Sequence, residues 1–241
     1  MKDFIFNLLF PRNIKCIQCN DEIDLDQLYS LCERCFKQTI FLKGNVCKFC
    51  GRLVKTGDIC LECEKNRYYF TRGYSIIDYN EASKKLLFKL KNYKKTYIAY
   101  YYAQMMYDKL RVEEILDYDC ITYVPSSRKK YNERGFNPTE RIAKHLSKYT
   151  GLPYKKLLHK NKATIAMKNL NRMQRKLTVK NTFDLVQKDL TFKRILLIDD
   201  VFTTGATLNE CSKVLYEKYL CEIITVTVYV GHSNKSEKGG K

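Results

Sequence analysis

The pattern of apolar and polar positions predicts strands alternating with helices from residue 67 to residue 232. Aromatic, β-branched or apolar runs predict strands at 68–79 (a strand or a hairpin), 121–124, 195–198 and 223–230. Amphipathic or apolar periodicity predicts helices at 83–91, 95–112, 137–149 and 206–219. Because strands alternating with helices form parallel, helix-covered sheets, we expect an α/β fold here.

The most informative polar segment follows the apolar run at 195–198. Asp199 and Asp200 come directly after it, and Thr203-Thr-Gly-Ala-Thr207 then leads into a predicted helix. Ligands of parallel sheets bind beyond the carboxyl ends of the strands. A carboxylate there can accept hydrogen bonds from ribose hydroxyls. Backbone N–H groups at a helix start can bind a phosphate, and Gly205 permits the close approach. The segment predicts a ribose-phosphate site, although Asp and Thr also cap helices.

Cysteine spacing sets residues 1–66 apart as a separate module. Eight of the eleven cysteines form four CxxC pairs: Cys16/Cys19, Cys32/Cys35, Cys47/Cys50 and Cys60/Cys63. Two such pairs a dozen or so residues apart can bind one tetrahedral Zn²⁺. Sequential pairing of the CxxC motifs predicts two zinc ribbons, and interleaved pairing is the alternative.

Two other interpretations of the CxxC pairs are disulfides and redox chemistry. A disulfide scaffold is typical of secreted proteins, and nothing in the sequence indicates export. Thiol exchange does not need four tandem CxxC motifs. With four thiolates each, the zinc sites have no open coordination position, so we expect them to be structural.

The chain carries a net charge of +18 over its 241 residues, which favours a polyanionic partner. Residues 1–66 are almost neutral, so the excess lies in the second part of the chain. Between Arg141 and Phe183 there are twelve Lys/Arg and no acidic residue. The basic loop predicted at 163–180 offers four candidate nucleic-acid contacts: Lys168, Arg172, Arg175 and Lys176.

A second basic region, from Lys84 to Lys109, contains seven lysines with tyrosines between them. Lysines could neutralise phosphates and tyrosines could stack on bases, as in proteins that bind single strands. The alternative is that the tyrosines pack in the core and the lysines form a solvated helix face. We favour the core for the tyrosines and a polyanion site for the acid-free stretch.

No transmembrane span is predicted. The apolar run at 4–10 is far shorter than the roughly 20 residues that a bilayer requires. It also lacks the features of a signal peptide. We expect a cytoplasmic protein, with a disordered polar tail at 233–241.

The segment 195–208 resembles the phosphoribosyl-pyrophosphate (PRPP) motif of type I phosphoribosyltransferases. With Val124-Pro-Ser-Ser-Arg128, Arg134-Gly-Phe-Asn137 and the four CxxC pairs, it resembles the ComF family over nearly the whole chain. These are bacterial phosphoribosyltransferase-like proteins linked to natural competence and the uptake or use of external DNA. The resemblance implies a type I phosphoribosyltransferase-like parallel sheet at 67–232, flanked by helices, after a small double zinc ribbon.

The resemblance also implies roles for individual residues. Asp199 and Asp200 would hold the ribose, and the segment Val201, Thr203, Thr204, Gly205, Ala206 and Thr207 would complete the PRPP loop. Ser126, Ser127 and Arg128 would face the pyrophosphate, with Mg²⁺ bridging oxygens of PRPP. Arg134 would either join them or anchor the helix at 137–149. Met167 and Leu177 depart from the family's usual glutamine and basic residue, so transfer activity is less secure than PRPP binding.

Three functions remain open. The first is a PRPP-binding accessory of DNA uptake that handles incoming single-stranded DNA. The second is an active phosphoribosyltransferase on a base or nucleic-acid acceptor. In the third, the zinc module docks on a helicase or ATPase of the uptake machinery, with PRPP as a regulatory ligand.

Overall fold

The computed structural model describes residues 14–161, 181–186 and 190–231. The apolar run at 4–10, the loop at 163–180 and the tail at 233–241 lie outside the described residues. The candidate contacts in that loop, and the two departures from the family pattern, lie there too. They are Lys168, Arg172, Arg175, Lys176, Met167 and Leu177.

The described elements begin in the cysteine-rich module and continue through the α/β part. They are η1 Leu28–Ser30, α2 Glu33–Gln38, α3 Leu61–Glu64, β1 Arg72–Asp78, α4 Glu81–Asn92, α5 Ile98–Val112, β2 Cys120–Tyr123, α6 Arg128–Arg134, α7 Pro138–Thr150, β3 Leu158–Lys160, β4 Phe183–Leu185, β5 Arg194–Phe202, α9 Ala206–Tyr219 and β6 Glu222–Val230. All the helices and strands predicted from residue 67 onward are present, with boundaries shifted by a few residues.

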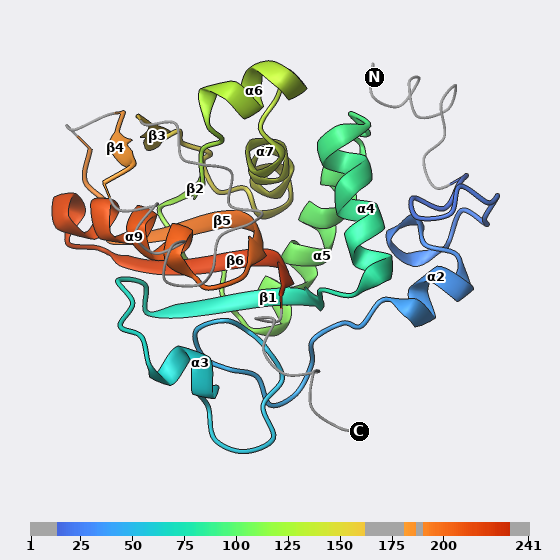
Figure 1. The fold of residues 1–241 in the computed structure, drawn as a ribbon, viewed down its shortest axis with the longest axis horizontal. Helices are drawn as coiled ribbons and strands as arrows, with labels where there is room; N and C mark the ends of the chain where they lie inside the picture. Colours follow the sequence, from blue (N-terminus) through green and yellow to red (C-terminus); the bar gives the residue numbers. More distant parts are fainter. Residues whose placement is uncertain (1–13, 162–180, 187–189, 232–241) are drawn as a thin grey trace, which may run out of the picture.

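The central sheet has the strand order β1-β6-β5-β2, and its neighbouring strands are all parallel. The predicted parallel, helix-covered sheet is therefore confirmed. The run at 68–79 contains a sheet strand rather than a hairpin, because β1 pairs in parallel with β6. The last strand in the sequence thus lies between the first strand and β5 (Figure 1).

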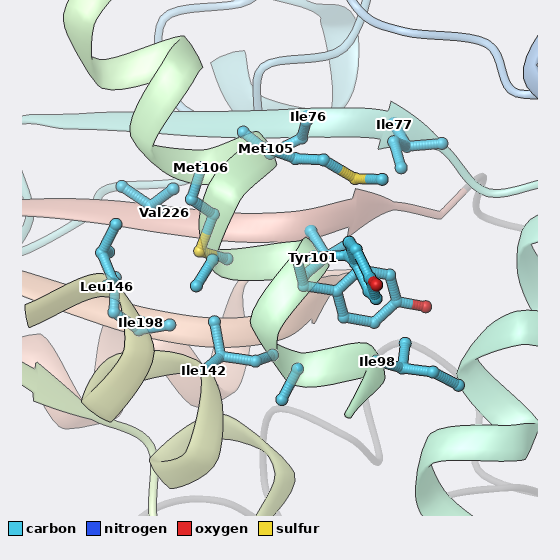
Figure 2. Close-up of a cluster of buried hydrophobic side chains, with 14 of the residues drawn as sticks. Ile76, Ile77, Ile98, Tyr101, Met105, Met106, Ile142, Leu146, Ile198 and Val226 are labelled. Atoms are coloured by element: carbon cyan, nitrogen blue, oxygen red, sulfur yellow. The ribbon is translucent and has the colours of Figure 1, made fainter. Parts of the chain in front are cut away.

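Two apolar clusters cover the two faces of the sheet. On one face α5 and α7 pack against the strands, with Met105, Met106 and Ile142 at most 1% exposed (Figure 2). On the other face α9 contributes Leu208 and Leu215 to a second cluster. Burying a side chain of this size stabilises the fold by about 1.5–3 kcal/mol. Because both faces are covered, the strands are buried on both sides and do not show the alternation of a half-exposed sheet.

The sequence sets the helix ends through ordinary capping residues. Asn80 and Ser83 form a reciprocal capping box at the start of α4. Helix α7 begins with Asn137 as its N-cap and Pro138 in its first turn, and it ends at Gly151, whose φ is 75°. In the parts of the chain that the structure describes, no helix has both the length and the apolarity to cross a membrane.

The cysteine-rich module covers the outer edge of β1. Asp78 N–H donates to Ile40 O, Leu42 N–H to Ile76 O, and Gly73 N–H to Lys48 O. A β-carbon on Gly73 would clash with the carbonyl oxygen of Phe49. The module therefore satisfies an edge that would otherwise offer unpaired backbone groups, and the close approach requires glycine.

Candidate functional site

The eight CxxC cysteines form two separate clusters, each of four sulfur ligands within 4.8 Å of one another. The first contains Cys16, Cys19, Cys32 and Cys35, and the second contains Cys47, Cys50, Cys60 and Cys63. The pairing is therefore sequential. Two clusters of four cysteines each fit a double zinc ribbon, in which four thiolates surround each tetrahedral Zn²⁺.

Hydrogen bonds to the sulfur atoms of the second cluster support this fit. The Cys60 N–H donates to Cys47 Sγ at 3.3 Å, and the Tyr68 hydroxyl donates to Cys63 Sγ at 3.6 Å. Donors of this kind stabilise thiolates and orient the ligands of a metal. The residues present thus suit a closed, structural zinc site.

Asp199 and Asp200 lie inside β5, because this strand continues through Phe202 instead of ending at Ile198 as the apolar run predicts. The two carboxylates act on opposite faces of the sheet. The charge of Asp199 acts on Cys211 of α9, and the charge of Asp200 acts on the buried hydroxyl of Tyr102 on α5. The pair is therefore held by the sheet itself, which fixes its position more rigidly than a loop does.

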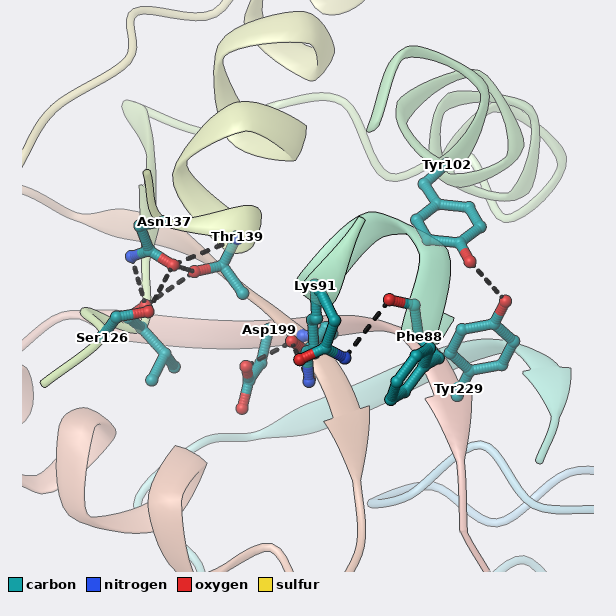
Figure 3. A network of polar contacts seen from close by, with 11 residues as sticks. Phe88, Lys91, Tyr102, Ser126, Asn137, Thr139, Asp199 and Tyr229 are labelled. Carbon is teal, nitrogen blue, oxygen red and sulfur yellow. Dashed lines mark hydrogen bonds and ion pairs between the residues drawn. The ribbon is translucent and has the colours of Figure 1, made fainter. Parts of the chain in front are cut away.

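Lys91 of α4 forms an ion pair with Asp200, with 2.7 Å between Nζ and Oδ2 and side chains 24% and 14% exposed. Figure 3 shows Lys91 beside Asp199 and near the hydroxyl–hydroxyl bond of 2.6 Å between Tyr102 and Tyr229. Burial raises the pKa of both tyrosines, and the charge of Asp200 adds to this. Tyr102 and Tyr229 therefore stay uncharged and hydrogen-bonded to each other beside the carboxylates.

Asp199 is the most perturbed carboxyl of the site. Burial raises its pKa to about 8, and the negative charge of Asp200 adds to the shift. The Asp200 N–H donates to Asp199 Oδ1 at 2.8 Å, which opposes it. A perturbed carboxyl of this kind is typical of a functional site. A bound cation would favour its ionised form.

Three lysines from three separate elements surround the carboxylates. Besides Lys91, Lys130 of α6 and Lys160 of β3 have lowered pKa values. For both lysines the first cause of the lowered pKa is desolvation by the surrounding protein, and the second is the charge of a neighbouring lysine. The Lys130 side chain is nevertheless partly exposed to solvent. Mutual repulsion of this kind creates a site for an anion.

The segment after β5 forms a phosphate-type turn. Gly205 has φ 73° and is the N-cap of α9, so no side-chain oxygen of that residue can cap the helix. Thr204 Oγ1 accepts from the Ala206 N–H at 3.4 Å, while Thr203 is exposed. The first turn of α9 therefore presents N–H groups to an anion beside the carboxylates. Val201, Ala206 and Thr207 are half-buried around this turn.

The loop after β2 is fixed by its own side chains. Ser126 Oγ donates to Asn137 Oδ1 at 2.9 Å, and the Thr139 hydroxyl donates to Val124 O at 2.7 Å (Figure 3). Ser127 is the N-cap of α6 and accepts from the Lys130 N–H at 3.4 Å. Both serine hydroxyls thus shape the loop, and its backbone remains the part suited to an anion.

The two arginines predicted near this loop lie at the ends of α6. Arg128 is exposed and, with Ser126 and Lys160, lines a cavity of about 360 Å³. Arg134 ends α6, and its charge contributes to the lowered pKa of Lys130. Arg134 therefore lies near Lys130. Its role, either in binding pyrophosphate or in anchoring the helix at 137–149, stays a prediction.

The tyrosines of the second basic region divide into two groups. Tyr101 and Tyr102 are at most 5% exposed and pack in the core, as favoured from the sequence. Tyr93 is 64% exposed and Tyr97 is 45% exposed, and Tyr93 makes an edge contact with Phe88 at 5.3 Å. Tyr100 and Tyr107 are half-buried and pack against the same core. The prediction that the tyrosines mostly pack in the core is therefore confirmed, with Tyr93 and Tyr97 as the exceptions.

Two family models match separate parts of the chain. The double zinc ribbon domain matches residues 5–64, and the phosphoribosyl transferase domain matches residues 132–240. The chain is 28% identical to Competence protein F of Haemophilus influenzae over 84% of this chain and 91% of that protein. It is 23% identical to Competence protein ComFC of Bacillus subtilis over 84% and 89%.

A further relative is the DNA utilization protein YhgH of Salmonella typhimurium, with 26% identity over 77% of this chain and 82% of that protein. Among solved structures, one of the allosteric regulatory enzyme of purine biosynthesis aligns at 20% identity with a TM-score of 0.35. That alignment covers 54% of this chain and 26% of the enzyme.

Sequence reasoning missed Lys130 and Lys160 as members of the site. Nothing in the sequence distinguishes them from the rest of the chain's 44 Lys/Arg. Sequence reasoning also missed Tyr68 and Arg52, which join the second cysteine cluster to the α/β part. Their partners in the α/β part, Phe202 and Gly231, are distant in sequence, and a local pattern carries no information on them.

Proposed function

Since this chain belongs to the ComF family of competence proteins, with a double zinc ribbon and a phosphoribosyltransferase domain, we propose that it binds PRPP with Mg²⁺ and handles incoming single-stranded DNA. The ribose-phosphate part of PRPP would bind at Asp199, Asp200 and the turn Thr203–Thr207. The observation that carries the PRPP proposal is the convergence of three lysines on a carboxylate pair beside an uncapped helix start.

The carboxylate pair and the cations suit different parts of the ligand. Asp199 and Asp200 would accept hydrogen bonds from the ribose hydroxyls, and the turn before α9 would bind the 5-phosphate. Mg²⁺ supplies charge neutralisation of the pyrophosphate and keeps several of its waters. Lys130 and Lys160 lie where a second anionic group would relieve their mutual repulsion. The loop after β2 would contribute backbone N–H groups.

Calorimetric titration of PRPP with Mg²⁺ into the zinc-loaded protein tests the site. The double variant Asp199→Ala, Asp200→Ala should abolish binding while the domain stays folded. The matched control is Asp117→Asn, because Asp117 pairs with Arg194 at the opposite end of the same strand. Unchanged affinity in the double variant, with the same thermal unfolding, would refute the assignment.

The same site would support group transfer if an acceptor nucleophile reached the anomeric carbon of PRPP. Developing charge on the leaving pyrophosphate would be stabilised by the cationic side chains. Release of pyrophosphate in the presence of candidate bases or oligonucleotides separates a transferase from a protein that only binds PRPP. If no pyrophosphate is released, PRPP would be a regulatory ligand. The hypothesis that the zinc module docks on an uptake helicase or ATPase also requires PRPP to be a regulatory ligand.

One surface favours the handling of single-stranded DNA. Phe88, Tyr93 and Tyr97 are between 45% and 64% exposed where α4 leads into α5. The exposed lysines around them in the sequence are Lys84, Lys85, Lys94 and Lys95. We call these seven residues the α4–α5 surface. Aromatic rings can stack on bases, at about 1–3 kcal/mol each, while lysines neutralise phosphates.

Binding of a labelled oligonucleotide at several salt concentrations tests this surface. Tyr93→Ala should weaken binding about tenfold or more through lost stacking, whereas Lys94→Gln with Lys95→Gln should flatten the salt dependence. Tyr216→Ala on α9 is the control, because Tyr216 is also 43% exposed. Neutralising Lys168, Arg172, Arg175 and Lys176 tests the other candidate stretch. Equal affinity in all variants would refute both surfaces.

A further inference from the structure

The second zinc ribbon (Cys47, Cys50, Cys60 and Cys63) contacts the turn before α9 through Tyr68. The Tyr68 hydroxyl donates to Cys63 Sγ at 3.6 Å, so one end of this side chain touches a zinc ligand. Beside that hydroxyl on the same ring, Cε1 of Tyr68 would lie 3.0 Å from a β-carbon built on Gly205, which would also lie 2.6 Å from Cζ of Phe202. The hydroxyl end of Tyr68 therefore lies between a sulfur ligand and the backbone of the proposed phosphate turn.

The Tyr68 ring is held on several sides. It stacks on Phe70 with 4.7 Å between ring centroids, and it lies 5.1 Å from Phe49, which belongs to the second ribbon. It also meets Phe202, the last residue of β5, edge-on at 6.4 Å. A ring with these neighbours has little freedom to move without moving the turn or the ribbon.

A second connection runs through Arg52. Its guanidinium pairs with Glu62 at 2.9 Å, with side chains 16% and 27% exposed, and donates to the Gly231 carbonyl at 2.6 Å. Gly231 N–H in turn donates to the Phe202 carbonyl at 2.8 Å. The ribbon is therefore bonded to the strand end that leads into the phosphate turn.

A third connection reaches the first turn of α9. Asn209 Oδ1 accepts from the Tyr69 N–H at 2.7 Å, and Asn209 Nδ2 donates to the Arg67 carbonyl at 3.3 Å. The Asn209 N–H donates to the Gly205 carbonyl at 2.8 Å. The segment that leaves the second ribbon thus holds the helix whose N-terminus would bind the phosphate.

The first ribbon (Cys16, Cys19, Cys32 and Cys35) docks elsewhere. Tyr29 donates to Asp108 of α5 at 2.9 Å, and Lys89 of α4 donates to the Gln18 carbonyl at 2.7 Å. Within the described residues, these bonds join the ribbon to α4 and α5, away from the turn before α9. The two ribbons thus provide an internal comparison within one chain.

We propose that Tyr68 is a positioning residue for the phosphate turn, and that zinc in the second ribbon sets the affinity of this turn for a phosphate ester. The inference rests on the proposed PRPP site for its ligand. When zinc occupies the second cluster, it fixes the position of Cys63. Tyr68, which is hydrogen-bonded to Cys63 Sγ, then holds the turn in its binding conformation. By thermodynamic linkage, a phosphate ligand on the turn must in return strengthen zinc binding in the second ribbon by the same factor.

The test uses the full chain loaded with zinc. Tyr68→Phe keeps the ring and removes its hydrogen bond to sulfur, so it should lower zinc affinity of one of the two sites about tenfold. It should also weaken the binding of Mg²⁺–PRPP several-fold, because a lost hydrogen bond corresponds to about a two- to tenfold change. Tyr29→Phe in the first ribbon removes a hydroxyl that bonds to Asp108 of α5 instead of to a zinc ligand, and it should leave PRPP affinity unaltered.

Zinc release to a coloured chelator gives a readout that a merely structural tyrosine would not alter. In the wild-type chain, Mg²⁺–PRPP should slow the release of one zinc ion and leave the other unaffected. In Tyr68→Phe this protection should shrink. Equal protection in Tyr68→Phe and wild type, or equal protection of both ions, would overturn the proposal.

A second variant tests the connection without PRPP. Gly205→Ala pushes a methyl group against Tyr68 and Phe202, so it should speed zinc release from one site. If wild type fails to bind PRPP but Gly205→Ala still speeds this release, the proposed function fails and the positioning contact stands. If Gly205→Ala releases both zinc ions at the wild-type rate, the contact fails, whatever PRPP does.

Discussion

The two zinc ribbons have four cysteine ligands each but different neighbours. The first is bonded to α4 and α5, and its buried residues join the apolar cluster that covers the α5 and α7 face of the sheet. The second lies against β1, the end of β5 and the start of α9, and Ser75 Oγ donates to the Cys50 carbonyl at 2.7 Å. The two ribbons thus share a cluster of four cysteines that fits zinc and differ in what they dock on, and this docking ties only the second ribbon to the proposed site.

The largest expected difference comes from removing one buried ligand of each ribbon. Cys63 and Cys35 are both 2% exposed, so Cys63→Ser and Cys35→Ser form a matched pair. Each should lose one zinc ion, whose binding is worth roughly 10–16 kcal/mol, but Cys63→Ser should lower the unfolding temperature of the α/β part more, because the second ribbon is bonded to β1 and α9. Thermal unfolding with metal analysis checks this. Equal unfolding temperatures would remove the distinction between the ribbons.

The next effect concerns the close contact of the second ribbon with β1. In Gly73→Ala the added methyl would meet Phe49 O and lie 2.8 Å from Thr225 Oγ1, so the ribbon must shift. We expect a loss of about 1–3 kcal/mol or more in the free energy of unfolding. Gly57→Ala, where a β-carbon meets nothing within 4 Å, should cost only the backbone strain of about 1–2 kcal/mol. Chemical denaturation measures both.

Ion pairs of the two ribbons offer a smaller contrast. Arg52 and Glu62 are half-buried, and Arg52 also bonds to Gly231, so Arg52→Ala should cost about 2 kcal/mol. Arg34 and Asp21 in the first ribbon are 66% and 57% exposed, and Arg34→Ala should cost about 0.5 kcal/mol or less. Denaturation midpoints of the two variants check the order, and the reverse order would contradict it.

The last contrast concerns Asp199 on β5 and depends on pH. The folded pKa of Asp199 is raised to about 8 from its ordinary value of 3.8, so the folded state binds more protons between these limits. Stability from this group is present below the lower value and is lost as pH rises to about 8, by up to about 1 kcal/mol per pH unit. Ligand-free unfolding between pH 6.5 and 8 measures the slope. Asp199→Asn should flatten it, and an equal slope would contradict the assignment.

Much of the fold could be predicted because long helices and strands give a recognisable pattern of apolar positions in the sequence. Helix α5 and strands β5 and β6 are apolar over enough residues to be recognised. Helix α6 was missed because Arg128-Lys-Lys-Tyr-Asn-Glu-Arg134 has no apolar face. The antiparallel pair of β3 and β4 was missed because three residues per strand are too few to show alternation.

The site could be predicted where its residues are consecutive and not where they converge. The spacing of the cysteines predicts the sequential zinc clusters, because each CxxC pair is local. Asp199 to Thr207 are likewise contiguous. Lys91, Lys130 and Lys160 come from three elements, and only the folded topology distinguishes them from the other lysines. How these residues act on PRPP stays a prediction.

The place of β6 between β1 and β5 has a consequence for biosynthesis. On the ribosome the zinc module and β1 emerge first, yet β1 acquires its sheet neighbour only when the last strand has been translated. Until then β1 is paired on one side only, by the module that covers its outer edge. Early metal loading would therefore cover one edge of β1 against pairing with other chains, while the edge that awaits β6 stays open.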